Sequence, residues 1–127
     1  MSATSSRPGL QALVSPSVVL TLLLFGANLV FNVIANSSFK ASAGSSSWRG
    51  FLLWQVIGNL AGFVTVLTLT AILRSVPLRV AFPVTVGLAV IGVQVVGARL
   101  LFHEPVSASQ WVGTLLIVAG IGLIGGR

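Results

Sequence analysis

The chain has 127 residues, of which 55% are hydrophobic and only 6% are charged, and its mean hydropathy is +1.06. About a quarter of the residues of a soluble globular domain are charged, so this composition excludes that class and indicates an integral membrane protein. The net charge is +6, but the seven basic residues stand singly between apolar runs, which excludes a basic patch for nucleic acid.

Cysteine is absent, and the one histidine and one acidic residue, His103 and Glu104, are too few for a metal cluster. We therefore expect no disulfide, no metal site and no cofactor. A transmembrane helix needs about 20 apolar residues, so the chain has room for about four such helices and for no soluble domain beside them. The sequence thus predicts an all-α membrane protein with four transmembrane helices.

Four apolar runs separated by polar turns give the expected domain organisation. Residues 1–16 are polar and are expected to form a flexible N-terminal segment, followed by a four-helix transmembrane domain over residues 17–127. The first apolar run is full length, which favours a retained helix over a cleaved signal peptide. The helices are predicted at about 17–39, 51–73, 80–102 and 109–124.

Three amides and a lysine recur every four residues along the first predicted helix, at Asn28, Asn32, Asn36 and Lys40. This spacing places them on one helix face. Lipid offers an amide no partner, so the face should meet other helices, a water-filled cavity or a ligand. The amides either line a substrate site or hold the bundle together through interhelical hydrogen bonds. Lys40 is either a phosphate contact or a lysine at the membrane interface.

Later polar residues are fewer. Gln55 and Asn59 share a face of the second helix, where they either line the same cavity or bond the asparagine stripe. Gln94 and Arg99 are the polar residues of the third helix, and Arg99 is close enough to its end to reach the interface. Glu104 follows in a loop, about one turn from Arg99, and is interpreted as a helix-end or salt-bridge residue.

The last predicted helix carries Gly113 and Gly120, which are seven residues apart and so lie on one face. Small residues on a membrane helix allow another helix to approach closely, which predicts a packing surface. With the N-terminus placed inside, four basic residues fall inside and three outside. This near balance predicts no membrane orientation.

The helices and their connecting motifs resemble the small multidrug resistance family of the drug/metabolite transporter superfamily. The resemblance covers nearly everything from Val18 to Gly125. It implies a four-helix bundle that dimerises, with Gly113 and Gly120 at the dimer seam. The motifs that carry it are the eight-residue interval from Asn32 to Lys40, the passage Val76–Pro83 (VPLRVAFP), and His103–Ser107 (HEPVS) followed by Trp111-Val112-Gly113 and a glycine-spaced helix.

Departures from the family pattern bear on the subfamily. Asn32 stands where the proton-coupled exporters carry a glutamate, and an amide cannot release a proton at this position. Phe82 and Thr85 stand where those exporters have a tyrosine and a tryptophan. The Ala-Phe-Pro passage and the HEPVS loop look closer to the paired small subunits that flip aminoarabinose-phosphoundecaprenol, and to single halves of the larger EamA-type transporters.

The sequence therefore predicts a transporter or flippase, not an enzyme, that moves an amphipathic, anionic, lipid-linked substrate of the polyprenyl-phosphate sugar type by alternating access. The alternatives are a small-molecule or drug exporter and a non-transporting accessory subunit. We expect a multi-pass protein of the bacterial inner membrane that forms a homodimer, or a heterodimer with a homologous four-helix chain. The expected substrate-binding residues are Asn28, Asn32, Asn36, Lys40, Gln55, Asn59, Phe82 and Thr85.

Overall fold

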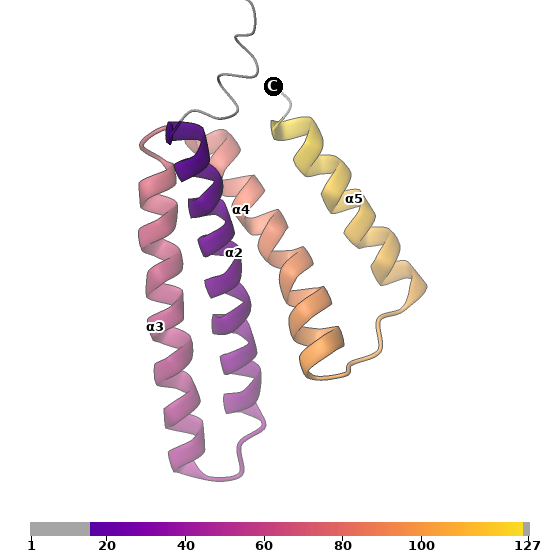
Figure 1. Cartoon of the computed structure of the whole chain (residues 1–127). Helices are drawn as coiled ribbons and strands as arrows, with labels where there is room; N and C mark the ends of the chain where they lie inside the picture. Colours follow the sequence, from indigo (N-terminus) through magenta and orange to yellow (C-terminus); the bar gives the residue numbers. More distant parts are fainter. Residues whose placement is uncertain (1–15, 126–127) are drawn as a thin grey trace, which may run out of the picture.

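The computed structural model describes residues 16–125, which form four long helices and no strand within that range (Figure 1). Each of the four is long and apolar enough to cross a membrane, which confirms the predicted fold class. The expected flexible segment lies outside the described residues, except for Pro16, which begins the first helix. The elements are α2 (Pro16–Ala43), α3 (Trp48–Ile72), α4 (Leu78–Gly92), its π-helical continuation η2 (Val93–Leu101) and α5 (Ala108–Gly125).

The first two helices extend further toward each other than the sequence suggested. α2 ends at Ala43 instead of residue 39, and α3 begins at Trp48 instead of residue 51. Ser42, expected in the turn, is fully buried near the end of α2, where its hydroxyl donates to the Phe51 carbonyl over 2.9 Å. Ser47 caps α3, since its side chain accepts the Gly50 N–H over 3.0 Å.

α2 and α3 form the most extensive helix pair, lying side by side along their length (Figure 1). The α4–η2 helix packs against α2, whereas α5 packs against α4 and leans away from α2 and α3. The buried hydrophobic side chains among the described residues are mostly small: Ala35, Ala61, Ala81 and Ile72. Small residues at these positions let the helix backbones approach closely, as is typical of membrane bundles.

Large apolar side chains cover the outside of the bundle. Leu22, Leu60 and Leu116 are each more than 60% exposed, and many other leucines, valines and phenylalanines project outward in the same way. In water such a surface would associate, but in a bilayer it contacts lipid tails that are equally apolar. The exposed apolar surface therefore fits a protein whose solvent is lipid.

Gly87 is the point of close approach between α4 and α5. A Cβ atom placed on Gly87 would lie 2.5 Å from Cδ1 and 2.8 Å from Cγ1 of Ile121. A side chain there requires Ile121 on α5 to shift, and α5 has few other contacts with the chain. The glycine thus fixes how α5 is attached.

We expect Gly87→Val to lower the free energy of unfolding by about 1–3 kcal/mol, because overpacking forces α4 and α5 apart. The measurement is the thermal unfolding midpoint in detergent micelles. Gly62→Val in α3 is the matched control, since an added Cβ there meets nothing within 4 Å. Equal losses in the two variants would contradict the assigned role of Gly87.

Candidate functional site

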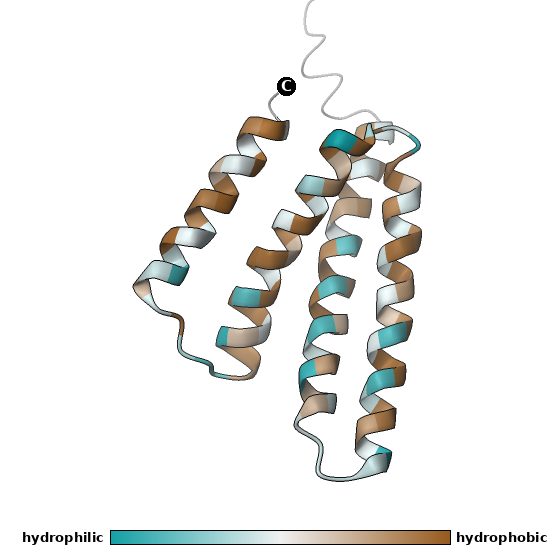
Figure 2. Ribbon diagram, turned by 180° about the vertical axis from the view of Figure 1, so that it is seen from behind, coloured by the Kyte–Doolittle hydropathy of each residue, from teal (hydrophilic) through white to brown (hydrophobic). Residues whose placement is uncertain are grey.

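A cavity of about 540 Å³ lies between α2, α3 and the α4–η2 helix. We call it the amide cavity, because most of its polar lining consists of asparagine and glutamine side chains. Hydrophilic residues recur along α2, as Figure 2 shows. The remaining wall is apolar, and none of the residues that line this cavity is ionisable. Its polar lining residues are Asn28, Asn32, Asn36, Thr65, Thr85 and Gln94.

Asn28 is the buried end of the asparagine stripe, with 3% of its surface exposed. Its Nδ2 donates to the Thr65 carbonyl over 2.9 Å and to Oγ1 of Thr68 over 3.0 Å, both on α3. These bonds join α2 to α3 at the membrane interior, where no water competes for them. Asn28 therefore forms interhelical hydrogen bonds, which is one of the two roles that the sequence left open for the asparagines.

The other two asparagines continue the stripe as a ladder along α2. Asn32 Nδ2 donates to the backbone carbonyl and to Oδ1 of Asn28, both over 3.0 Å. Asn36 Nδ2 donates in turn to the Asn32 carbonyl over 2.9 Å. A carbonyl oxygen can only accept a hydrogen bond, so each bond requires the Nδ2 atom of the side-chain amide, and not its Oδ1 atom, to face that carbonyl. Asn28 and Asn32 thus use both N–H donors of their amides within the ladder and α3, whereas Asn36 uses one.

The carbonyl oxygens of two of these amides remain available. Within residues 16–125 no hydrogen bond reaches Oδ1 of Asn32 or of Asn36. Both residues line the amide cavity, so α2 offers it two unpaired amide oxygens and the second N–H of Asn36. A ligand would meet this side of the cavity with hydroxyl, amine or amide N–H groups.

Gln94, on η2, lies on the opposite wall of the same cavity. Its Nε2 is buried and has no hydrogen-bond partner among the described residues. A buried donor without a partner is costly, which makes it a point where a ligand or water would bind. The π-helical stretch that carries Gln94 is a form of helix that often occurs at functional sites.

Phe82 and Thr85 also line the amide cavity, from α4. Phe82 is 53% exposed and contributes an open aromatic surface. Thr85 is buried, and its hydroxyl donates to the Ala81 carbonyl over 2.9 Å and to the Phe82 carbonyl over 3.0 Å. Its methyl group is thus left to shape the wall.

Gln55 and Asn59 lie away from this cavity, and neither bonds the asparagine ladder. Gln55 Nε2 donates to Ser42 Oγ over 3.3 Å, which ties the lower ends of α3 and α2 together. Asn59 Nδ2 donates to the carbonyl of Gln55 over 2.7 Å and more weakly to its Oε1. The structure therefore separates these two amides from the five expected substrate-binding residues that line the amide cavity.

Lys40 lies beyond the ladder and forms an ion pair with Glu104, with 3.0 Å between Nζ and Oε1. The side chains are 57% and 44% exposed, so the pair contributes about 0–1 kcal/mol. His103 adopts a left-handed conformation, with φ 52°, and the Glu104 N–H bonds the Ala98 carbonyl over 2.8 Å. This turn brings Glu104 to Lys40, so the salt-bridge partner is Lys40 and not the nearby Arg99.

Gln94 and Glu104 were not among the substrate-binding residues expected from the sequence. The rule that marked the asparagines, that lipid cannot satisfy an amide, applies equally to Gln94 and would have identified it. For Glu104 no such signal exists, because its partner is far away in the sequence. Within residues 16–125 there is no group of three or more metal-ligating side chains.

Four helices that are long and apolar enough to cross a membrane, three of which line a cavity without ionisable side chains, define a multi-pass membrane protein. The chain belongs to the Small Multidrug Resistance protein family, whose model matches residues 19–117. It is a protein of the bacterial inner membrane. No solved structure gives a significant match.

Its relatives include several bacterial proteins with one description, "probable 4-amino-4-deoxy-L-arabinose-phosphoundecaprenol flippase subunit ArnE". The protein of Pseudomonas fluorescens (strain Pf0-1) is 33% identical over 64% of this chain and 68% of its own length. That of Aeromonas salmonicida (strain A449) is 31% identical over 64% and 70%. That of Enterobacter sp. (strain 638) is 42% identical over 43% and 50%.

We expect Asn28→Ala to lower the free energy of unfolding by about 1–2 kcal/mol, because it removes two bonds to α3 and leaves Asn32 without its side-chain acceptor. Asn36→Ala removes an exposed amide at the other end of the ladder and should change stability by less than about 0.5 kcal/mol. Unfolding of both variants in detergent by a denaturant titration makes the comparison. Similar values for the two would show that Asn28 does not join the helices.

Proposed function

We propose that the protein translocates an amphipathic, anionic, lipid-linked molecule of the polyprenyl-phosphate sugar type across the membrane by alternating access. The relatives named as aminoarabinose-phosphoundecaprenol flippase subunits support this substrate class. The observation that carries the proposal is the chemistry of the amide cavity, which sets six polar uncharged side chains in an otherwise apolar wall and is formed by helices long and apolar enough to cross a membrane.

Hydrogen-bond complementarity favours a sugar-like head group in the amide cavity. The open Oδ1 atoms of Asn32 and Asn36 accept from hydroxyl or amino groups, and Gln94 Nε2 donates to a ring or hydroxyl oxygen. A small hydrophobic drug would leave these groups unpaired, at a cost that a hydroxylated head group avoids. The exposed ring of Phe82 adds an apolar surface for the face of a sugar ring.

Lys40 supplies a positive charge at the edge of this region. It shares a small pocket with Asn36, which also lines the amide cavity, so a phosphate bound there would lie next to the head group. An ammonium group meets a phosphate as a point charge and needs no fixed geometry. Asn32 cannot exchange a proton, so translocation proceeds without proton release at this position.

Asn32→Ala and Lys40→Ala are each expected to reduce translocation in reconstituted vesicles by about ten-fold or more. Asn32→Ala removes a hydrogen-bond acceptor for the head group, and Lys40→Ala removes the positive charge that binds the phosphate. Accessibility of a fluorescent polyprenyl-phosphate sugar on each leaflet provides the measurement. Thr70→Ala and Arg49→Ala are controls, since both residues are exposed and lie outside the amide cavity and the Lys40 pocket.

Unchanged translocation in both Asn32→Ala and Lys40→Ala, with the folded state intact, would instead indicate an accessory subunit. Release of a proton on substrate binding would indicate exchange transport of the kind expected from a drug exporter. Either result would overturn the proposal.

We further propose that the working unit is a dimer, either of this chain or with a homologous four-helix chain. The wall of the amide cavity is open along α4, where Phe82, Val86 and Val90 recur every four residues and are 40–53% exposed. On α5, added side chains at Gly113 and Gly120 would meet nothing within 4 Å in this chain. A second chain would close the cavity, with α5 as the contact.

Replacing both Gly113 and Gly120 by leucine should abolish the dimer and leave each chain folded, because the new side chains obstruct only an approaching helix. Native mass spectrometry from lipid nanodiscs reports the number of chains. The matched control replaces Gly62 on α3, which also has open space around it. A dimer that survives in the double variant would rule out this face of α5 as the seam.

A further inference from the structure

Two further pockets follow the amide cavity in a series in which each shares lining residues with the next. A small pocket of about 130 Å³, here called the junction, holds Lys40 and Glu104 and shares Asn36, Val93 and Ala98 with the amide cavity. A larger pocket of about 720 Å³, here called the apolar groove, shares Ser37 and Phe102 with the junction. Polar, charged and apolar surfaces thus follow one another around α2.

The apolar groove lies between α2, α3 and η2. Its lining on α2 runs from Leu29 to Ala41, a length of about 18 Å at 1.5 Å per residue. This is more than half of the hydrocarbon core, which is roughly 30 Å thick. Two serines are its only polar lining, and one of them, Ser38, has its hydroxyl bonded to the Ile34 carbonyl. The groove therefore matches a long hydrocarbon chain lying along α2.

The junction holds a donor without a partner. Ser37 Oγ is buried and has no hydrogen-bond partner among the described residues. Gly97 opposes it, and a Cβ atom there would lie 3.2 Å from this oxygen, so the glycine leaves the hydroxyl open. Ser37 lies one turn before Lys40, and both line the junction. An anion in the junction would meet a hydroxyl and an ammonium group together.

Glu104 already supplies such an anion. Both members of its pair with Lys40 are about half exposed, so a phosphate could replace the carboxylate without uncovering a buried charge. A phosphate also brings more negative charge and more acceptor oxygens than a carboxylate. The Lys40–Glu104 pair thus shows that the junction accommodates an anionic group beside Lys40.

We propose that the three pockets bind one amphipathic phosphate lipid: the phosphate sits in the junction on Lys40 and Ser37 in place of Glu104, the hydrocarbon chain lies in the apolar groove, and the head group enters the amide cavity. This deepens the proposed function and rests on it. The apolar groove adjoins the charged junction. A neutral lipid would gain nothing from that charge, so we assign the groove to the hydrocarbon chain of the molecule whose phosphate binds in the junction.

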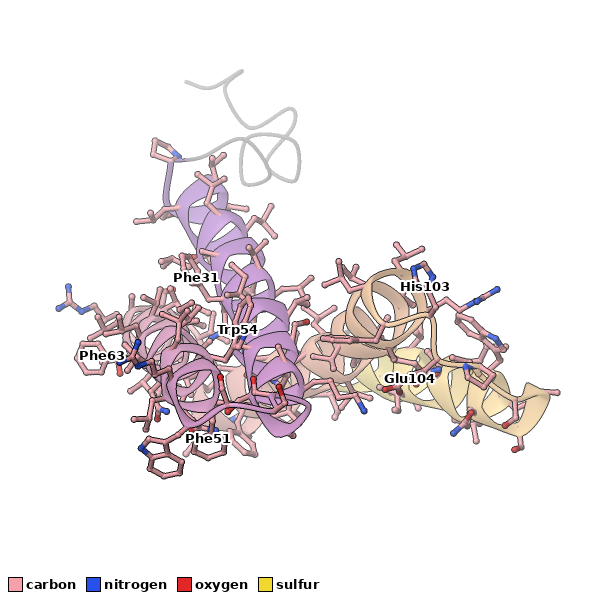
Figure 3. The ribbon with its side chains drawn as sticks, turned by 90° about the horizontal axis from the view of Figure 1, so that it is seen from below. Phe31, Phe51, Trp54, Phe63, His103 and Glu104 are labelled. Atoms are coloured by element: carbon pink, nitrogen blue, oxygen red, sulfur yellow. The ribbon has the colours of Figure 1, made fainter. Side chains whose placement is uncertain are left out.

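Trp54 offers a direct test, because it lines the apolar groove and is one of three tryptophans in the chain. Figure 3 shows Trp54 projecting from α3 on the side of α2, and Glu104 on the connection to α5. With Trp48 and Trp111 replaced by phenylalanine, fluorescence of the full-length protein in nanodiscs reports on the groove alone. The probes are farnesyl phosphate, farnesol and inorganic phosphate.

Farnesyl phosphate is expected to change Trp54 fluorescence saturably, farnesol to bind at least about ten-fold more weakly, and inorganic phosphate to compete without changing the signal. Lys40→Ala should weaken farnesyl phosphate binding by about ten-fold, whereas Glu104→Gln should tighten it by about two- to five-fold, since it removes the competing carboxylate. Arg49→Ala, at the same end of the molecule but outside the junction, should leave binding unchanged.

A purely structural ion pair would make both substitutions weaken binding, and that result would overturn the assignment. Equal binding of farnesol would show that the groove takes any apolar chain, which also overturns it. A Trp54 signal that depends on protein concentration and not on the probe would place a second copy in the groove. If the protein binds farnesyl phosphate but does not translocate the polyprenyl-phosphate sugar, the result counts against the proposed function alone. If it translocates that lipid but does not bind farnesyl phosphate, the result counts against this inference alone.

Discussion

The pair of hydrogen bonds from Asn28 to α3 is the interaction on which the site depends. An amide at this depth has no water to bond, so its NH₂ group is committed to the Thr65 carbonyl and Thr68 Oγ1. That commitment turns Oδ1 of Asn28 toward Asn32, whose own NH₂ must then face it. Asn36 is oriented separately, because its NH₂ group donates to the backbone carbonyl of Asn32. The bonds from Asn28 to α3 thus act directly on the orientation of Asn32, the next amide of the cavity wall.

Much of this arrangement follows from local rules that a sequence reveals. Four apolar runs predict four helices, and the four-residue spacing predicts that Asn28, Asn32 and Asn36 share a face, as they do. The same spacing for Gln55 and Asn59 predicts a shared face but not its direction, which is set by how α3 rotates against α2. Periodicity gives positions within one helix, whereas the partner of each face depends on packing between helices.

The features that the sequence did not reveal are those that join distant segments. Lys40 and Glu104 meet because α2 is longer than expected and because His103 turns the chain back at the end of η2. A left-handed histidine has no sequence signature as clear as that of glycine. The π-helical geometry of η2 likewise has no clear sequence signature, although it determines which residues, Gln94 among them, line the cavity.

The asparagine ladder also has an electrical consequence. Asn32 and Asn36 each donate to the carbonyl four residues earlier, which copies the direction of the backbone hydrogen bonds. Their amide dipoles therefore add to the macrodipole of α2, with the negative end toward its C-terminus. Lys40 lies in the last turn, at that negative end. The row of neutral amides thus stabilises a positive charge beside the cavity, a role that the ladder performs without carrying any charge itself.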